Sequence, residues 1–187
     1  VNMIYKINSS NTSSALVTWA SLNNETILAT TSDGTYLYVA TSLGIYDIKM
    51  SDGTCHKSYN YGALTAEHAV LKYVKGRIVG AGKFTNGAFA AYELYFPNKG
   101  SGASVEIKPT MTAADGVLID GSTNMPTGWV WNCITEARNA IYLGGYSGEH
   151  STIFKLQVNS DGSLGTIITT AVLPRGEVIL SLYSYLG

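Results

Sequence analysis

A short alternating pattern recurs four times in this chain and restricts its fold more than any other feature. Each copy contains a small or branched apolar residue, an aromatic residue, a polar or charged residue and an aliphatic residue. The copies are Ile4–Ile7, Ile45–Ile48, Ala91–Leu94 and Ile153–Leu156. Alternation with a period of two is typical of a β-strand. The four copies therefore predict one strand type repeated along an all-β chain.

The distances between the copies indicate which repeated β-fold this is. The aromatic residues are separated by 46−5 = 41, 92−46 = 46 and 154−92 = 62 positions. The first two spacings fall in the ~40–50 residue range of β-propeller blades. The third contains an insertion, which we place in Pro97–Thr127, a segment rich in Gly, Ser, Pro, Thr and Asn that is typical of a long loop.

Further strand-like runs surround each copy, so that a complete unit has four strands. The alternating copies are the third strands. The first strands are expected at Thr26–Thr31, Ala69–Val74 and Trp129–Thr135, and the second strands at Tyr36–Ala40, Arg77–Gly82 and Ala140–Gly145. The fourth strands are expected at Ser14–Trp19, Thr54–Tyr59, Ser104–Lys108 and Thr166–Leu173. Asp33-Gly34, Asp52-Gly53 and Asp161-Gly162, with Lys75-Gly76, supply hairpin turns. We expect Trp129, Trp131, Ile141 and Phe154 to be buried between blades.

These observations predict a single β-propeller domain over residues 1–187, built from about four four-stranded antiparallel blades. The same pattern also fits one part of a larger propeller. The expected units are 1–22, 23–64, 65–127, 128–175 and a last strand in 176–187. In this last unit, Val178–Ser184 resembles a first strand. It either closes the ring beside Ile4–Ile7 or begins the next blade of a larger propeller. A β-sandwich and a β-solenoid are the alternatives.

The composition limits the function. Charged residues make up 13% of the 187 residues, and the net charge is −1, so no general electrostatic attraction to nucleic acid or an anionic membrane is expected. The apolar runs are far below the ~20 residues of a membrane helix, and no membrane insertion is expected. A surface of hydroxyls and amides is common in extracellular and virion β-proteins. Cys55 and Cys133 are expected to be free thiols.

No catalytic or metal-binding constellation is evident, and we expect a non-enzymatic protein without a cofactor. His56, His68 and His150 are scattered over different units and lack metal-ligand spacing. Asp33, Asp52 and Asp161 are explained by their turns. We find no two carboxylates that the repeat would place face to face, as glycoside hydrolysis requires.

The same residues carry a resemblance to a known family. The segments Tyr73–Ile78, Ala91–Leu94, Gly128–Trp131, Ala140–Gly148 and Leu173–Gly187 together resemble the propeller region of minor tail proteins of tailed phages that infect actinobacteria. The resemblance implies a structural or host-contacting part of a phage tail, located in the virion and otherwise extracellular. In that family the region normally continues beyond the Tyr-Leu-Gly end.

Exposed loops on one face are the expected contact surface. The candidate loops are Lys83–Ala88, Pro97–Thr127 and Tyr146–Ser151, and the candidate contact residues are Phe84, Asn86, Tyr146, Glu149 and His150. The expected partners are other tail proteins or a host cell-surface glycan, and an oligomer is compatible with this use. The alternatives are a carbohydrate-binding propeller lectin and, with less support, a propeller glycosidase.

Overall fold

A computed structural model describes residues 3–18, 20–94, 105–106, 117–119 and 126–185, and it arranges the strands of these residues in four sheets. The first sheet pairs β1 (Ile4–Ile7) with β2 (Ser13–Val17), and a short 3-10 turn, η1 (Ala20–Leu22), follows. The other strands are β3 (Ile27–Ser32), β4 (Tyr36–Thr41), β5 (Gly44–Lys49), β6 (Cys55–Asn60), β7 (Ala66–Val74), β8 (Arg77–Phe84), β9 (Phe89–Leu94), β10 (Val105–Glu106), β11 (Val117–Ile119), β12 (Val130–Ala137), β13 (Ala140–Ser147), β14 (His150–Val158) and β15 (Leu164–Val172).

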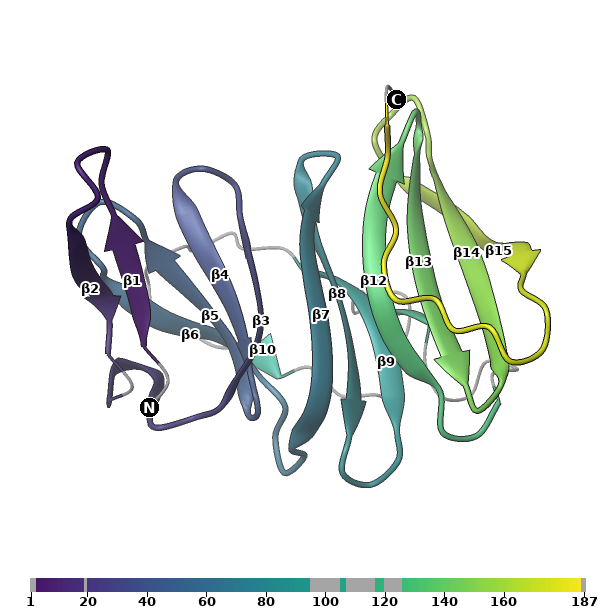
Figure 1. Cartoon of the computed structure of the whole chain (residues 1–187), viewed down its shortest axis with the longest axis horizontal. Coiled ribbons are helices and arrows are strands. Elements are labelled where there is room, and N and C mark those ends of the chain that lie inside the picture. The colour runs from purple at the N-terminus through teal and green to yellow at the C-terminus, as the bar shows by residue number, and fades with distance from the viewer. Residues whose placement is uncertain (1–2, 19, 95–104, 107–116, 120–125, 186–187) are drawn as a thin grey trace.

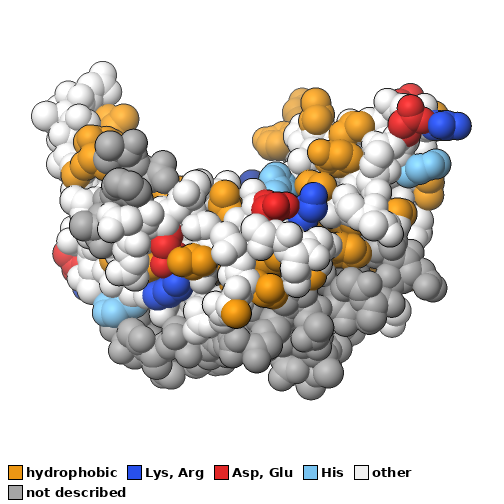
Figure 2. Space-filling view, turned by 90° about the horizontal axis from the view of Figure 1, so that it is seen from below, with side chains coloured by type: hydrophobic (Ala, Val, Ile, Leu, Met, Phe, Trp, Pro, Cys, Tyr) orange, Lys and Arg blue, Asp and Glu red, His pale blue; other side chains and the backbone are white. Residues whose placement is uncertain are grey.

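Sequence neighbours pair in antiparallel order within each sheet. The orders are β3-β4-β5-β6-β10, β7-β8-β9-β11 and β12-β13-β14-β15, and among these described strands β10 alone pairs in parallel, with β6. The first strands β3, β7 and β12 lie next to one another from sheet to sheet, and the sheets stand side by side (Figure 1). This is the arrangement of β-propeller blades. The ring is not closed: Figure 2 shows the molecule hollowed between the β1–β2 sheet and the β12–β15 sheet.

Three apolar cores lie between successive sheets. The core between the first two sheets includes Val17, Leu22 and Tyr46. The next core includes Tyr61 and Phe84, whose rings meet edge to face at 5.1 Å. The last core includes Trp129, Trp131, Ile134, Ile141, Leu143 and Leu156. Each blade therefore buries its apolar faces against its neighbours, and the predicted burial of Trp129, Trp131 and Ile141 is confirmed. Phe154, the fourth residue predicted to be buried there, is half-buried and packs against the same core.

Small residues in the second strands permit this close packing. A Cβ added at Gly80 would lie 2.6 Å from the Tyr92 ring, and one added at Gly145 would lie 2.6 Å from the Trp129 ring. Contacts this short do not occur in folded proteins, so the large aromatic side chains fit only against glycine.

A buried polar cluster links the loop before β3 to three neighbouring strands. The Glu25 carboxylate accepts hydrogen bonds from Thr41 Oγ1 at 2.5 Å and Tyr46 Oη at 2.8 Å. Lys57 Nζ lies 2.8 Å from the same carboxylate. Since Glu25 is only 5% exposed, these partners stabilise a charge that would otherwise be costly to bury. Burial raises the pKa of Tyr46 well above its usual range, and the hydrogen bond to Glu25 adds to the shift.

The insertion changes the fourth strand of the third blade. We predicted this strand at Ser104–Lys108, and the prediction is wrong. Val105–Glu106 forms β10, which pairs in parallel with β6 of the preceding sheet. The fourth position is filled by β11, which is antiparallel to β9. Most of Pro97–Thr127 lies outside the described residues.

The segment after β15 is not a strand either, although Val178–Ser184 was predicted to be one. It crosses the outer face of the β12–β13 hairpin (Figure 1). Ile179 is buried there, and Asn132 Nδ2 donates a hydrogen bond to its carbonyl oxygen at 2.5 Å. Ser151 Oγ donates to the Glu177 carbonyl oxygen at 2.7 Å. The segment has a fixed place on the last blade, and it does not close the ring beside β1. We call residues 173–185 the C-terminal segment.

Candidate functional site

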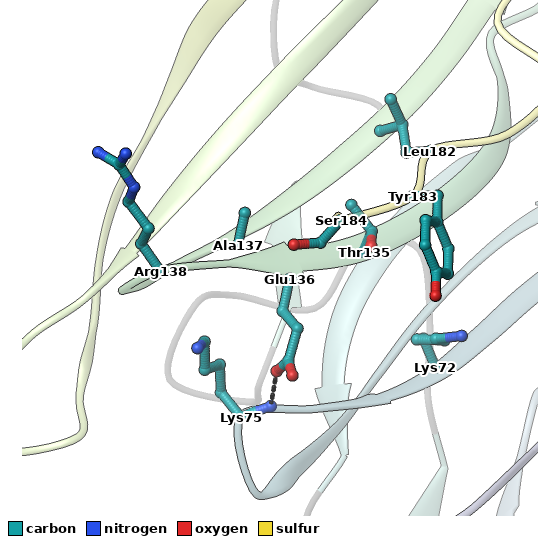
Figure 3. Close-up of a pocket in the computed structure, with 9 residues that line it drawn as sticks. All are labelled: Lys72, Lys75, Thr135, Glu136, Ala137, Arg138, Leu182, Tyr183 and Ser184. Carbon is teal, nitrogen blue, oxygen red and sulfur yellow. Dashed lines mark hydrogen bonds between the residues drawn. The ribbon is translucent and has the colours of Figure 1, made fainter. Parts of the chain in front are cut away.

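A hollow of about 350 Å³ opens where two hairpin turns and the C-terminal segment meet. The β7–β8 and β12–β13 turns lie on the same face of the propeller, because both join a first strand to a second strand (Figure 1). We call this the turn face. Nine residues line the hollow and are drawn in Figure 3: Lys72, Lys75, Thr135, Glu136, Ala137, Arg138, Leu182, Tyr183 and Ser184. We call it the cationic groove.

The backbone of the two turns places two of the cations. Lys75 and Arg138 occupy matching positions, directly after β7 and β12, and both have left-handed φ values, 49° and 51°. Such a conformation reverses the chain within a two-residue turn. Glu136 fixes one turn against the other, because its carboxylate accepts the backbone N–H of Lys75 at 2.6 Å (Figure 3).

The cations of the groove are free of carboxylate partners, unlike most others in the described part of the chain. Lys49, Lys57, Arg77, Lys83 and Arg175 all form ion pairs. Within the described residues, Lys72, Lys75 and Arg138 form none. Glu136 is the single carboxylate among the nine described lining residues, so their formal charge is 3 − 1 = +2, on a chain of net charge −1. Such a local charge attracts anions.

An exposed aromatic ring forms one end of the groove. Tyr183 is 89% exposed, and its side chain lies on the Lys72 side of the hollow in Figure 3. Its neighbour Leu182 is half-buried and lies near Gly144 of β13. The C-terminal segment is therefore a wall of the groove, held by the buried Ile179 and the half-buried Leu182. A flat exposed ring of this kind can stack on a sugar or another planar group.

A second hollow, of about 440 Å³, adjoins the first and shares Lys75 with it. Its other lining residues are Asn139, Gln157, Val158, Asn159 and Ser160. Gln157 Nε2 of β14 donates to the backbone carbonyl oxygen of Asn139 at 2.8 Å, so this bond ties β14 to the β12–β13 turn of the same sheet. The lining residues are thus cationic in the first hollow and mostly neutral, with hydrogen-bonding side chains, in the second.

The described residues contain no group of three or more His, Cys, Asp or Glu side chains that could hold a metal ion. Burial raises the pKa of the Cys55 and Cys133 thiols to about 11, which keeps them protonated and weakly nucleophilic.

His68 Nε2 lies 2.7 Å from the Trp131 carbonyl oxygen between two blades. In the described regions no helix is long and apolar enough to cross a membrane.

The contact residues predicted from the sequence lie elsewhere. The prediction that Phe84 is a surface contact is wrong, because its ring is fully buried against Tyr61. Tyr146 is half-buried. Glu149 is exposed in the β13–β14 turn and pairs with Arg175, and His150 is exposed at the first position of β14.

Asn86 is exposed in the β8–β9 turn, and its Oδ1 accepts the Ala88 N–H at 3.0 Å. The β8–β9 and β13–β14 turns join second to third strands, so they lie on the face opposite the turn face (Figure 1). The structure therefore does not bring the predicted contact residues to the cationic groove.

Sequence reasoning missed the groove itself. The usable signal was a basic residue in the first turn of two successive units, at Lys75 and at Arg138. From the sequence, Lys75-Gly76 is interpreted only as a turn.

Comparison with known proteins shows a distant structural likeness to a β-propeller. No family model matches this chain, and no curated protein matches it. Among solved structures, the β-propeller domain of Cps50 (Swd1) from Myceliophteria thermophila is similar, with 13% sequence identity and a TM-score of 0.45. The alignment covers 89% of this chain and 51% of that one, so this chain spans about half the length of the propeller it matches.

Proposed function

We propose that this protein is a non-enzymatic β-propeller module of a phage tail that contacts the host surface by binding a glycan in the cationic groove. The observation that carries the proposal is the groove: three cations without carboxylate partners among the described residues, and an exposed tyrosine ring, line one open hollow of the turn face. The phage-tail setting rests on the sequence resemblance in Tyr73–Ile78, Ala140–Gly148 and Leu173–Gly187.

The lining of the groove favours binding over hydrolysis. Glycosidases use two carboxylates, ~5 or ~6.5–9.5 Å apart across the scissile bond. Among the described residues, Glu136 is the single carboxylate in the lining of the groove. It already accepts the Lys75 backbone N–H, so it serves to position the turn.

Binding to intact cells tests the proposal. The labelled protein is mixed with actinobacterial cells and with the glycan extracted from their walls, and the bound fraction is measured against concentration. Tyr183→Ala should weaken binding by about five- to tenfold, the contribution of one stacked ring. Tyr5→Ala is the matched control, because Tyr5 is also exposed but lies on β1, at the other end of the molecule. Absence of binding to both cells and extracted glycan would refute the proposal.

A second candidate function is assembly with other tail proteins through the open ends of the arc. The β1–β2 sheet leaves Tyr5 54% and Ile7 67% exposed, and its β1 edge has no strand partner within the described residues. Exposed apolar groups at an open edge are typical of a protein interface. Light scattering of the purified protein, and of Ile7→Ser as a comparison, tests this candidate. A monomer that also binds no tail protein would exclude it.

A further inference from the structure

We infer that the ligand of the cationic groove is an acidic saccharide chain, carrying carboxylates or phosphates. The inference rests on the proposed function and names the chemistry of its ligand. It begins with the position of the charges: Lys72 and Arg138 come from different blades and lie at opposite ends of the lining in Figure 3, with Lys75 between them. Charges spread in this way match anionic groups repeated along a chain better than they match one small anion.

The uncharged groups of the two hollows favour a saccharide. Asn139, Gln157, Asn159 and Ser160 lie directly beyond Lys75. Gln157 Nε2 already donates to two backbone carbonyl oxygens, and Asn159 Nδ2 donates to Ser163 Oγ. The Asn139 side-chain amide, the Ser160 hydroxyl and the amide oxygens remain, and such groups suit sugar hydroxyls. Tyr183, at the other end, offers a ring for a sugar face. A sugar chain with anionic groups would contact the ring, the cations and the amides in that order.

Nucleic acid fits the same surface less well. Proteins that bind it contact many phosphates, commonly about 6–10, and single strands are held by aromatic side chains that stack on successive bases. The groove has three cations and one exposed ring in its described lining. A short acidic saccharide needs no more than these.

The closing experiment compares ligands that differ only in charge. Isothermal titration of the protein with a galacturonate hexamer and with its methyl ester isolates the carboxylates. A phosphomannan oligomer and its dephosphorylated form do the same for phosphates. Single-stranded DNA of equal charge is the last arm. We expect at least one acidic saccharide to bind, and its neutral form to bind about tenfold more weakly or not at all.

Variants then locate the binding. Lys72→Gln and Arg138→Asn should each weaken binding by about two- to fivefold, the usual contribution of an exposed ion pair. Asparagine tolerates the left-handed backbone of Arg138, so the turn should survive. Lys6→Gln removes an exposed charge from β1, far from the groove, and should change nothing.

The outcomes separate the two proposals. Equal binding of the acidic and neutral saccharides would overturn the inference and leave a glycan-binding module. No saccharide binding at all, together with no binding to cells, would overturn both. Tighter binding of the DNA than of every acidic saccharide would overturn the inference in favour of nucleic acid. Unchanged binding by Lys72→Gln and Arg138→Asn would also overturn it, because the charges would then act elsewhere.

Discussion

Trp131 allows a sharp test of how the blades are held together. Its side chain is fully buried between the third and fourth sheets, and its ring meets Trp129 at 5.5 Å and Phe154 at 5.6 Å, both edge to face. Trp131→Ala removes the ring and leaves a cavity, which should lower the free energy of unfolding by about 3–5 kcal/mol. That is a large part of the 5–15 kcal/mol that stabilises a typical domain.

Trp131→Phe should behave very differently. The indole Nε1 is buried, with no hydrogen-bond partner among the described residues, and an unpaired buried N–H costs about 1–3 kcal/mol. Phenylalanine removes this group and keeps most of the ring, while the lost ring atoms cost about 1–2 kcal/mol. The two effects nearly cancel, so we expect a change within about 1 kcal/mol.

Urea titration followed by circular dichroism measures both variants. The midpoint should fall strongly for Trp131→Ala and little for Trp131→Phe, at an unchanged slope. Tyr5→Ala, an exposed aromatic substitution, should stay within about 0.5 kcal/mol of the unsubstituted protein. Equal losses for the two Trp131 variants would refute the reasoning, because the indole N–H would then contribute to stability.

Three other predictions concern buried groups. Glu25→Gln should lower the free energy of unfolding by about 3 kcal/mol, because it leaves the Lys57 ammonium without its carboxylate. Adding Lys57→Met to this variant should restore part of the lost stability. Additive losses in the double variant would contradict the pairing. Burial raises the pKa of Tyr92 to about 12 from its usual 10.0, so the unfolded chain loses this proton first. Stability should therefore fall between pH 10 and 12, and urea midpoints of Tyr92→Phe should fall less steeply over that range. Ile179→Ser should release the C-terminal segment and speed modification of Cys133 by a thiol reagent about tenfold; an unchanged rate would mean that the segment does not shield the thiol.

The sequence could predict the strands because each one carries its own local signal. β5 was predicted at Ile45–Ile48 and extends from Gly44 to Lys49. The Asp52-Gly53 turn follows it, and the φ of Gly53 is 78°, as a glycine turn requires. Alternation and turn chemistry act over a few residues, so they survive without knowledge of the partner strands.

Pairing over long distances could not be predicted in this way. Val178–Ser184 has the alternation of a first strand, but alternation does not show whether a neighbouring strand offers free N–H and C=O groups. In the structure this segment lies against the β12–β13 hairpin through side chains, with Ile179 over Gly144. Similarly, β10 pairs with β6 across a long stretch of chain, and nothing local to Val105–Glu106 specifies that partner.

The cationic groove depends on the repeat and on a departure from it. The first hairpin turn of each complete blade lies on the turn face, so its residues form a row across successive blades. In that row, Asp33 of the second sheet occupies the position that Lys75 occupies in the third sheet and Arg138 in the fourth. Asp33 accepts the Thr35 and Tyr36 N–H groups and the Tyr38 hydroxyl, which commits its carboxylate to its own hairpin. Cations from two successive turns therefore line one hollow between the third and fourth sheets, and a binding surface can form there without any change in the blade fold.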